Sequence, residues 1–183
     1  MDARTLYRLG GGAAVFGGAV RIGAAFAPAF LTPPQTQALY LVVDVFLLAG
    51  LFAVYGRYAG ALGWIGLLGF VAALAGFCLI RTGVLLGQET YAAGGGLCLL
   101  GAALIGSRMP AEPGFPRLAP LLWMSAVVIG VAGAFWPPVA WGVAAAGILF
   151  ALGFAAAGVA LIRGAGRGQA SAAPAHSSVR AGA

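Results

Sequence analysis

Residues 37–55 read QALYLVVDVFLLAGLFAVY, an apolar run that a single aspartate, Asp44, interrupts. A helix needs about 20 predominantly apolar residues to cross the hydrocarbon core of a bilayer, so this run predicts a membrane-spanning helix. Further runs of comparable character occupy residues 9–31, 61–86, 91–107, 118–136 and 139–163. We therefore expect an all-α fold, a polytopic transmembrane bundle of six helices.

The connections between these runs contain residues that interrupt helices. TPPQTQ (32–37) follows the first run, GRYAGA (56–61) separates the second from the third, and WPP (136–138) precedes the last. Proline and glycine clusters of this kind are typical of turns. The third run has an open boundary, because LIRTGVLLG (79–87) also fits a helix that ends near residue 80 and another that starts near residue 83.

The composition excludes an ordinary soluble domain. Hydrophobic residues make up 62% of the 183 residues and charged residues 8%, whereas about a quarter of a soluble domain is charged. All ten basic residues are arginine, which is typical of a GC-rich bacterial genome, and they form no basic stripe with interleaved aromatic residues. The net charge of +6 therefore does not indicate nucleic acid as a partner. The expected partner is the lipid bilayer, and the expected location is a bacterial inner membrane.

The arginines also predict the orientation of the chain. With the N-terminus in the cytoplasm, the cytoplasmic segments contain Arg4, Arg8, Arg57, Arg108, Arg117, Arg163, Arg167 and Arg180. The external connections contain no arginine if the third helix runs to Leu86, and only Arg81 if it ends earlier. Positive residues accumulate on the cytoplasmic side of membrane proteins, so both termini are expected there. On this topology Trp64 and Trp123 lie near the inner interface, and Trp136 and Trp141 near the outer one.

The two ends of the chain carry separate expectations. Residues 1–163 form the transmembrane domain, and the small, polar residues 164–183 are expected to be a disordered cytoplasmic tail. At the N-terminus an alternative remains, because Arg4, Arg8 and GAAFA (23–27) also resemble a signal peptide with a small-residue cleavage site. Pro28 directly after that site disfavours cleavage, which would leave five helices.

A cluster of polar residues is expected in the outer half of the membrane. At about 1.5 Å of rise per residue, Arg21, Asp44, Arg81 and the turn that contains Glu89 lie at comparable depths. Gln37, Tyr40 and Asp44 share one helix face at i, i+3 and i+7. The candidate ligand site therefore consists of Arg21, Gln37, Tyr40, Asp44, Arg81 and Glu89.

Arg21 lies within GGAVRIGAAF (17–26), and a charge inside a bilayer costs several kcal/mol unless it faces the bundle interior and is paired. We expect Arg21 to pair with Asp44, with Arg81 and Glu89 at the rim. Three interpretations follow: an ion pair that only fixes helix register, an outward-facing cavity for a polar or anionic ligand, or an unpaired Arg21 that snorkels to the interface.

Residues for catalysis or for a cofactor are scarce. The only histidine, His176, lies in the polar tail, no CxxC occurs, and Cys78 and Cys98 fall at different depths, so no disulfide is expected. Zinc and haem sites and histidine-based triads therefore lack their ligands or base. The GGG stretches at 10–12 and 94–96 follow no strand and precede no GK[ST], so they are no phosphate loop. We expect no enzyme, no metal and no cofactor.

Six pairs of small residues at i, i+4 lie in three of the six runs. They are Ala14/Gly18, Ala19/Gly23, Gly69/Ala73, Ala72/Gly76, Gly142/Ala146 and Gly153/Ala157. Such pairs let two helix backbones approach closely in lipid. They predict tight packing within one bundle, and a face of this kind also suits association with a second copy or with another membrane subunit.

Residues 38–76 combine LYLVVD (39–44) with GWIGLLGF (63–70). In this pairing the stretch resembles small uncharacterised multi-helix membrane proteins of GC-rich bacteria, which join an LY-x-VVD helix to a G-x-x-GLLGF helix. The resemblance implies a multi-span protein of the inner membrane and no activity. The expected function is a non-enzymatic bundle with an accessory, scaffold or assembly role, held by an intramembrane Arg/Asp pair; the alternative is a small transporter or ligand-binding protein that uses the polar cluster.

Overall fold

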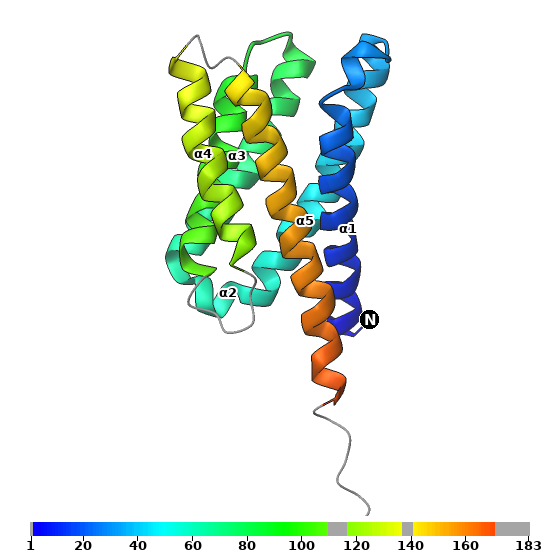
Figure 1. The fold of residues 1–183 in the computed structure, drawn as a ribbon, viewed down its shortest axis with the longest axis vertical. Coiled ribbons are helices and arrows are strands. Elements are labelled where there is room, and N and C mark those ends of the chain that lie inside the picture. Colours follow the sequence, from blue (N-terminus) through cyan, green and yellow to red (C-terminus); the bar gives the residue numbers. More distant parts are fainter. Residues whose placement is uncertain (1, 110–116, 137–140, 171–183) are drawn as a thin grey trace, which may run out of the picture.

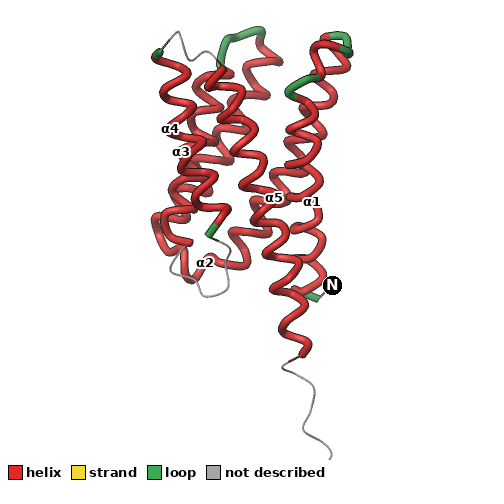
Figure 2. The backbone as a smooth tube through the Cα atoms, viewed as in Figure 1, coloured by secondary structure: helices red, strands yellow, loops and turns green. Residues whose placement is uncertain are grey.

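The computed structural model describes residues 2–109, 117–136 and 141–170, and all regular structure in these ranges is helical (Figures 1 and 2). The expected all-α fold is thereby confirmed for the described residues. The elements are α1 (Ala3–Ala24), the short 3-10 helix η1 (Ala27–Ala29), α2 (Pro33–Leu86), α3 (Tyr91–Arg108), α4 (Leu118–Phe135) and α5 (Trp141–Ala170).

Helix α2 contains two of the predicted runs. It is 54 residues long and is interrupted at Gly63, whose backbone has φ 58° and ψ −155°, a conformation essentially restricted to glycine. We call residues 33–62 the N arm and residues 64–86 the C arm. The N arm descends to the lower end of the bundle and the C arm returns from it (Figure 1). The predicted connection GRYAGA (56–61) is helical instead, because none of its residues leaves the helical region and the chain reverses only at Gly63.

The C arm runs to Leu86, so the alternative end near residue 80 is wrong. Gly87 stops the helix with a positive φ of 63°. The N–H of Gln88 then donates to the carbonyl of Gly83 at 2.9 Å, which is a bond of the left-handed glycine cap. Arg81 consequently lies within the helix, in the second turn from its end.

The first run ends earlier than predicted. Helix α1 stops at Ala24, and Pro28 lies in the separate helix η1, so Arg21 occupies the last turn of α1 rather than the middle of a span. The next helix has its own start signal: the Gln35 Oε1 atom accepts from the Thr32 N–H and from its hydroxyl, both at 3.0 Å. The bond from the Thr32 N–H is one of the two bonds of a capping box, and Pro33 follows at the first helical position. Arg21 is therefore close to the end of the bundle.

The helices pack as two groups that meet at the lower end and along α4 and α5. Helix α1 packs against α2 and α5, α3 packs against α2 and α4, and α4 packs against α5. Among the described residues neither α1 nor α5 forms an extensive interface with α3. The first group is α1, the N arm and α5; the second is the C arm, α3 and α4. In Figure 1 the second group lies to the left of α1.

Small residues make the close contacts that the i, i+4 pairs predict. A Cβ atom placed on Gly50 would lie 2.6 Å from the Cβ of Ala14, and one on Gly69 would lie 2.7 Å from the carbonyl oxygen of Gly101. The Ala19/Gly23 pair is the exception: both residues are exposed, and a Cβ on Gly23 would meet no atom within 4 Å. That face of α1 is unpacked.

The Trp123 side chain does not face the membrane interface. Its side chain is 1% exposed, its Nε1–H donates to the carbonyl of Phe150 at 3.2 Å, and its ring packs edge-on against Phe154. Trp123 is a core residue, because Gly153 leaves room for the indole on the facing helix. Trp64, Trp136 and Trp141 are 65–70% exposed near the two ends of the bundle, which suits an interfacial position.

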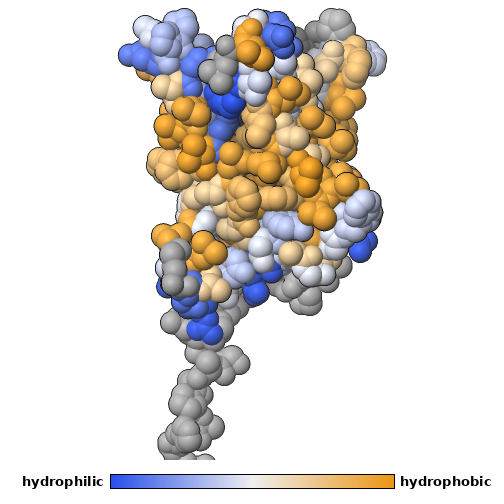
Figure 3. All heavy atoms as spheres, turned by 180° about the vertical axis from the view of Figure 1, so that it is seen from behind, coloured by the Kyte–Doolittle hydropathy of each residue, from blue (hydrophilic) through white to orange (hydrophobic). Residues whose placement is uncertain are grey.

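The outer surface is apolar over the middle of the molecule (Figure 3). Val45, Leu121 and Val128 are 57–67% exposed, and a surface of this kind indicates contact with lipid or protein. Among the described residues three helices, α2, α4 and α5, are long and apolar enough to cross a membrane. Helix α5 continues through residues 164–170, the first part of the predicted tail, and the remaining residues 171–183 lie outside the described ranges.

Candidate functional site: a cavity between the two helix groups

Asp44 pairs with Arg81, and not with Arg21 as expected. The Nε and Nη2 atoms of Arg81 both contact the Oδ2 atom of Asp44. The two side chains are 23% and 13% exposed, so the pair is mostly enclosed by protein. Because Asp44 belongs to the N arm and Arg81 to the C arm, the ion pair joins the two arms of α2 far from their connection at Gly63.

Arg21 contacts aromatic residues instead of a carboxylate. Its Nη2 atom donates to the Tyr91 hydroxyl at 3.4 Å, and its guanidinium carbon lies 5.1 Å from the centre of the Tyr40 ring. Asp44 is near enough to attract Arg21 electrostatically, but its Oδ2 atom is already bound by Arg81. The reason for the different pairing is the early end of α1: Arg21 lies about 4–5 Å from the helix end, and Asp44 about 16 Å from the start of α2.

Of the other residues predicted for the site, Gln37 and Tyr40 lie near the Asp44–Arg81 pair and Glu89 does not. Tyr40 donates from its hydroxyl to the carbonyl of Ala24 at 3.0 Å, which fixes the end of α1 against the N arm. Gln37 and Tyr40 line the same cavity as Asp44, as their shared helix face predicts. Glu89 is exposed in the α2–α3 connection, is not part of the cavity wall, and forms no hydrogen bond or ion pair with another described residue.

A cavity of about 640 Å³ separates the two helix groups near the upper end of the bundle. This size is within the range of about 300–1,000 Å³ typical of small-molecule sites. Its wall takes residues from the last part of α1, the first part of the N arm, the last part of the C arm, the beginnings of α3 and α5 and the end of α4. These segments all lie at the end of the bundle that carries the α1–α2 and α2–α3 connections (Figure 1). We call this the upper end.

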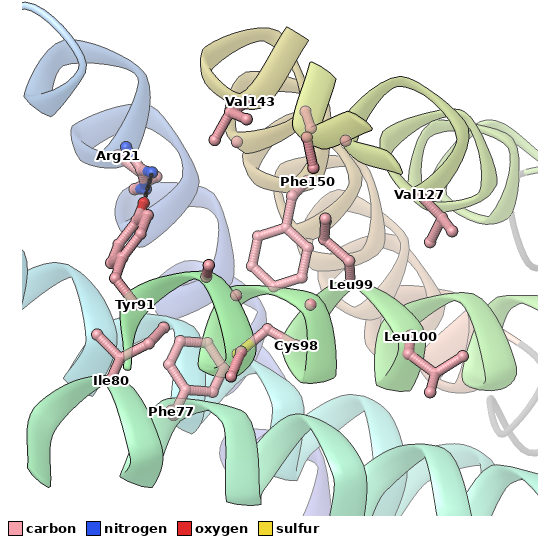
Figure 4. Close-up of a pocket in the computed structure, with 18 of the residues that line it drawn as sticks. Arg21, Phe77, Ile80, Tyr91, Cys98, Leu99, Leu100, Val127, Val143 and Phe150 are labelled. Carbon is pink, nitrogen blue, oxygen red and sulfur yellow. Dashed lines mark hydrogen bonds between the residues drawn. The ribbon is translucent and has the colours of Figure 1, made fainter. Parts of the chain in front are cut away.

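The cavity is polar on one side and apolar on the other. Arg21, Gln37, Tyr40, Asp44, Arg81 and Tyr91 supply the polar wall. Figure 4 shows Phe77, Cys98, Leu99 and Phe150 on the opposite side, with Arg21 and Tyr91 at one edge. In the view from behind, hydrophilic residues extend as a strip from the upper end into the apolar surface (Figure 3). The lower half contains the large buried side chains Leu51, Leu62, Ile105, Met109, Trp123 and Phe154.

Sequence reasoning did not identify Tyr91 or the apolar wall. Tyr91 opens α3, and its position depends on Thr90, whose hydroxyl donates to the carbonyl of Leu79 at 2.8 Å. A Cβ atom on Gly83 would overlap Thr90, so the glycine permits this contact. The signal available in the sequence was the position of Tyr91 directly after the expected outer connection at 87–90, at the same side of the membrane as Arg21, which precedes the outer connection at 32–37. Cys98, whose thiol donates to the carbonyl of Ala73 at 3.6 Å, carried no such signal.

The polar wall has an excess of positive charge. Among the described lining residues two arginines face one carboxylate, and that carboxylate is bound to Arg81, so the Arg21 guanidinium retains N–H donors for a further partner. In a partly enclosed, low-dielectric site such a group attracts anions more strongly than it would in water. The geometry suits a molecule with an acidic group at Arg21 and an apolar part against Phe77 and Phe150.

Comparison with known proteins finds no matching family model, no matching curated protein and no matching solved structure. The functional argument therefore rests on the geometry of this chain.

Proposed function

We propose that the chain is a six-span protein of a bacterial inner membrane, with both ends in the cytoplasm. The two arms of α2 count as separate spans in this topology. The distribution of the arginines supports this topology. Six of them lie at the lower end of the bundle or next to it in sequence: Arg4, Arg8, Arg57, Arg108, Arg117 and Arg163. Both arginines of the upper half, Arg21 and Arg81, point into the cavity wall instead of toward a connection. This asymmetry is that of the positive-inside rule.

Helix α1 belongs to the mature bundle in this proposal, and is not a cleaved signal. Its glycines pack into both neighbours: a Cβ atom on Gly11 would lie 2.8 Å from the carbonyl oxygen of Gly158 of α5, and one on Gly17 2.9 Å from the Cβ of Phe46 of α2. Removal of α1 would also remove Arg21 from the cavity wall. Reporter fusions after Thr90 should report the outer side, and fusions after Tyr58 or Gly166 the cytoplasm; a cytoplasmic report at Thr90 would overturn the topology.

We propose further that the bundle binds a small molecule in the cavity and acts as a binding protein or small transporter, without catalysis. The observation that carries the proposal is the cavity itself, which contrasts with the close helix contacts at small residues such as Gly50 and Gly69. A bundle with a purely architectural role gains dispersion energy by closing such a space. A cavity with one polar wall and one apolar wall is the form expected of a ligand site.

The scaffold role expected from the sequence remains a second candidate. The observation that favours it is the Arg81–Asp44 pair, which joins the two arms of α2 and thereby stabilises the reversal of the chain. Partners for such a role would dock on the exposed apolar surface. The two candidates differ in what the cavity holds, so the decisive experiment changes the cavity and leaves the ion pair intact.

The experiment compares Gly95→Leu with Gly12→Leu. Gly95 lines the cavity, Gly12 does not, and a Cβ atom at either position would meet no atom within 4 Å, so neither change creates a clash at the first side-chain atom. Wild-type protein and both variants are extracted in native lipid particles, and the small molecules retained are identified by mass spectrometry. We expect one compound near equimolar amounts in wild type and Gly12→Leu, and its loss in Gly95→Leu. Identical profiles in all three proteins would contradict the binding function.

A further inference from the structure

We infer that the ligand of this cavity is an amphipathic anion, with its acidic group at Arg21 and its apolar part between the C arm, α3 and α5. The inference rests on the proposed binding function and adds the chemical class of the ligand. It follows from three features of the wall: the free donors of Arg21, the occupied state of Asp44, and the apolar residues beyond them.

The first feature is that Arg21 is held in place without being neutralised. Tyr40 lies under its guanidinium at 5.1 Å and is itself fixed by its hydrogen bond to Ala24, and the Tyr91 hydroxyl accepts one hydrogen bond at 3.4 Å. A Cβ atom on Gly147 would lie 3.0 Å from the Nη2 atom, so the glycine leaves just enough room for the guanidinium. A guanidinium has five N–H donors in a rigid plane, a geometry that matches a carboxylate or a phosphate.

The second feature excludes a cationic ligand group. Asp44 is the only carboxylate among the described residues of the cavity wall, and Arg81 contacts its Oδ2 atom through two nitrogens. A cation would have to displace Arg81 and would at the same time approach Arg21. Both steps oppose binding, because like charges at short range repel and an unpaired Arg81 in a partly enclosed site is costly.

The third feature sets the shape of the rest of the ligand. The apolar lining residues include Phe77, Ile80, Leu99, Val131, Val143 and Phe150, and Figure 4 shows Phe77 and Phe150 facing the same space from two helices, with Cys98 between them. Burial of apolar surface there contributes about 25 cal/mol per Å². A ligand that carried only an acidic group would gain nothing from this wall.

The position of Arg21 also gives the direction of entry. It lies in the last turn of α1 near the upper end, whereas Cys98 lies two turns into α3. The acidic group therefore stays near the membrane interface and the apolar part reaches toward the middle of the bundle. On the proposed topology, this entry faces the outer side of the membrane.

The test uses purified protein in nanodiscs of phosphatidylcholine, which has no net charge, and three probes: decanoate, decanol and acetate. Binding is measured by calorimetry. Decanoate has both an acidic group and an apolar chain, decanol has the chain alone, and acetate has the acid alone. For wild-type protein we expect decanoate to bind at least about tenfold more tightly than decanol, as a charge-assisted hydrogen bond provides, and acetate to bind too weakly to measure.

The variants separate the charge from the fold. Arg21→Met should weaken decanoate about tenfold or more and leave decanol within about twofold, whereas Arg21→Lys, which retains the charge, should keep most of the preference for decanoate. Arg163→Met removes an exposed arginine outside the cavity and serves as the matched control. Repetition in phosphatidylglycerol nanodiscs identifies the source of the anion: loss of decanoate binding assigns the site to an anionic lipid, and retention assigns it to a free amphipathic acid.

The inference fails if decanol binds wild type as tightly as decanoate, or if Arg21→Met leaves the preference unchanged. The binding function would survive either result, because decanol would still occupy the cavity and Gly95→Leu would still abolish its binding. If no probe binds and Gly95→Leu retains the same molecules as wild type, the binding function fails together with the inference.

Discussion

The ion pair between Asp44 and Arg81 allows the strongest stability prediction. We consider Asp44→Leu, Arg81→Met and the double variant. Each single change leaves one charge without its partner inside the bundle. The side chains of Arg81 and Asp44 are 23% and 13% exposed, so the cost should be about 2–3 kcal/mol, somewhat below the ~3–5 kcal/mol typical of a fully buried pair.

The two single variants should differ in a defined direction. Arg81 has a long stem that can carry its charge toward the upper end when Asp44 is removed, which lowers the cost of Asp44→Leu. Asp44 is short and lies about 16 Å from the start of α2, so its charge stays at the same depth in the cavity wall when Arg81 is removed. Its remaining attraction is to Arg21. We expect Arg81→Met to be the more destabilising change.

The double variant leaves no unpaired charge from this pair, so its stability should return to within about 1 kcal/mol of wild type. The coupling energy from the double-mutant cycle should then be about 2 kcal/mol or more. Stability is measured by reversible unfolding in mixed micelles with increasing dodecyl sulfate, followed by far-UV circular dichroism. Arg163→Met is the control for loss of an exposed arginine and should change stability by less than about 0.5 kcal/mol. Additive losses in the double variant would refute the pairing, and so would single variants as stable as wild type.

Three further changes test other parts of the fold in the same unfolding assay. Gly63→Ala should cost about 1–3 kcal/mol, because φ 58° with ψ −155° is strained for any residue with a Cβ atom. The control Gly60→Ala should be neutral or stabilising, because Gly60 is in an exposed helical position with no atom within 4 Å of the added carbon. Equal effects at both sites would contradict the break at Gly63. Gly76→Ala should be strongly destabilising, since its Cβ would lie 2.5 Å from the carbonyl oxygen of Gly94 and 2.7 Å from the amide nitrogen of Cys98. The control Gly96→Ala should not destabilise, because its Cβ would meet no atom within 4 Å. A stable Gly76→Ala variant would mean that α2 and α3 are less closely packed. Trp123→Phe should cost about 1–3 kcal/mol, because it removes the buried Nε1–H bond to the Phe150 carbonyl and part of the ring volume that fills the core. No loss of stability would contradict the buried position of Trp123.

The positions of the helices were largely readable from the sequence, because lipid-compatible helices require long apolar runs and the chain contains little else. Local chemistry also located several ends: Gly87 ends α2, and Thr32, Pro33 and Gln35 start it, through contacts between residues close together in the chain. The Gln37, Tyr40 and Asp44 face was predictable for the same reason, since helical spacing alone places these residues together.

The partner of each charge was decided only by the tertiary structure. Arg21, Arg81 and Asp44 were all identified from the sequence, but two arginines competed for one carboxylate, and helix lengths had to be known to within one turn to choose between them. The break at Gly63 rather than within 56–61 shows the same limit: several glycines can allow a reversal, and only the three-dimensional structure shows which one adopts the required backbone conformation. The cavity arises because α3 lacks an extensive interface with α1 and α5. A cavity between helices that are distant in the chain produces no periodic pattern in the sequence. It depends on the relative positions of several helices, which no local stretch of residues determines.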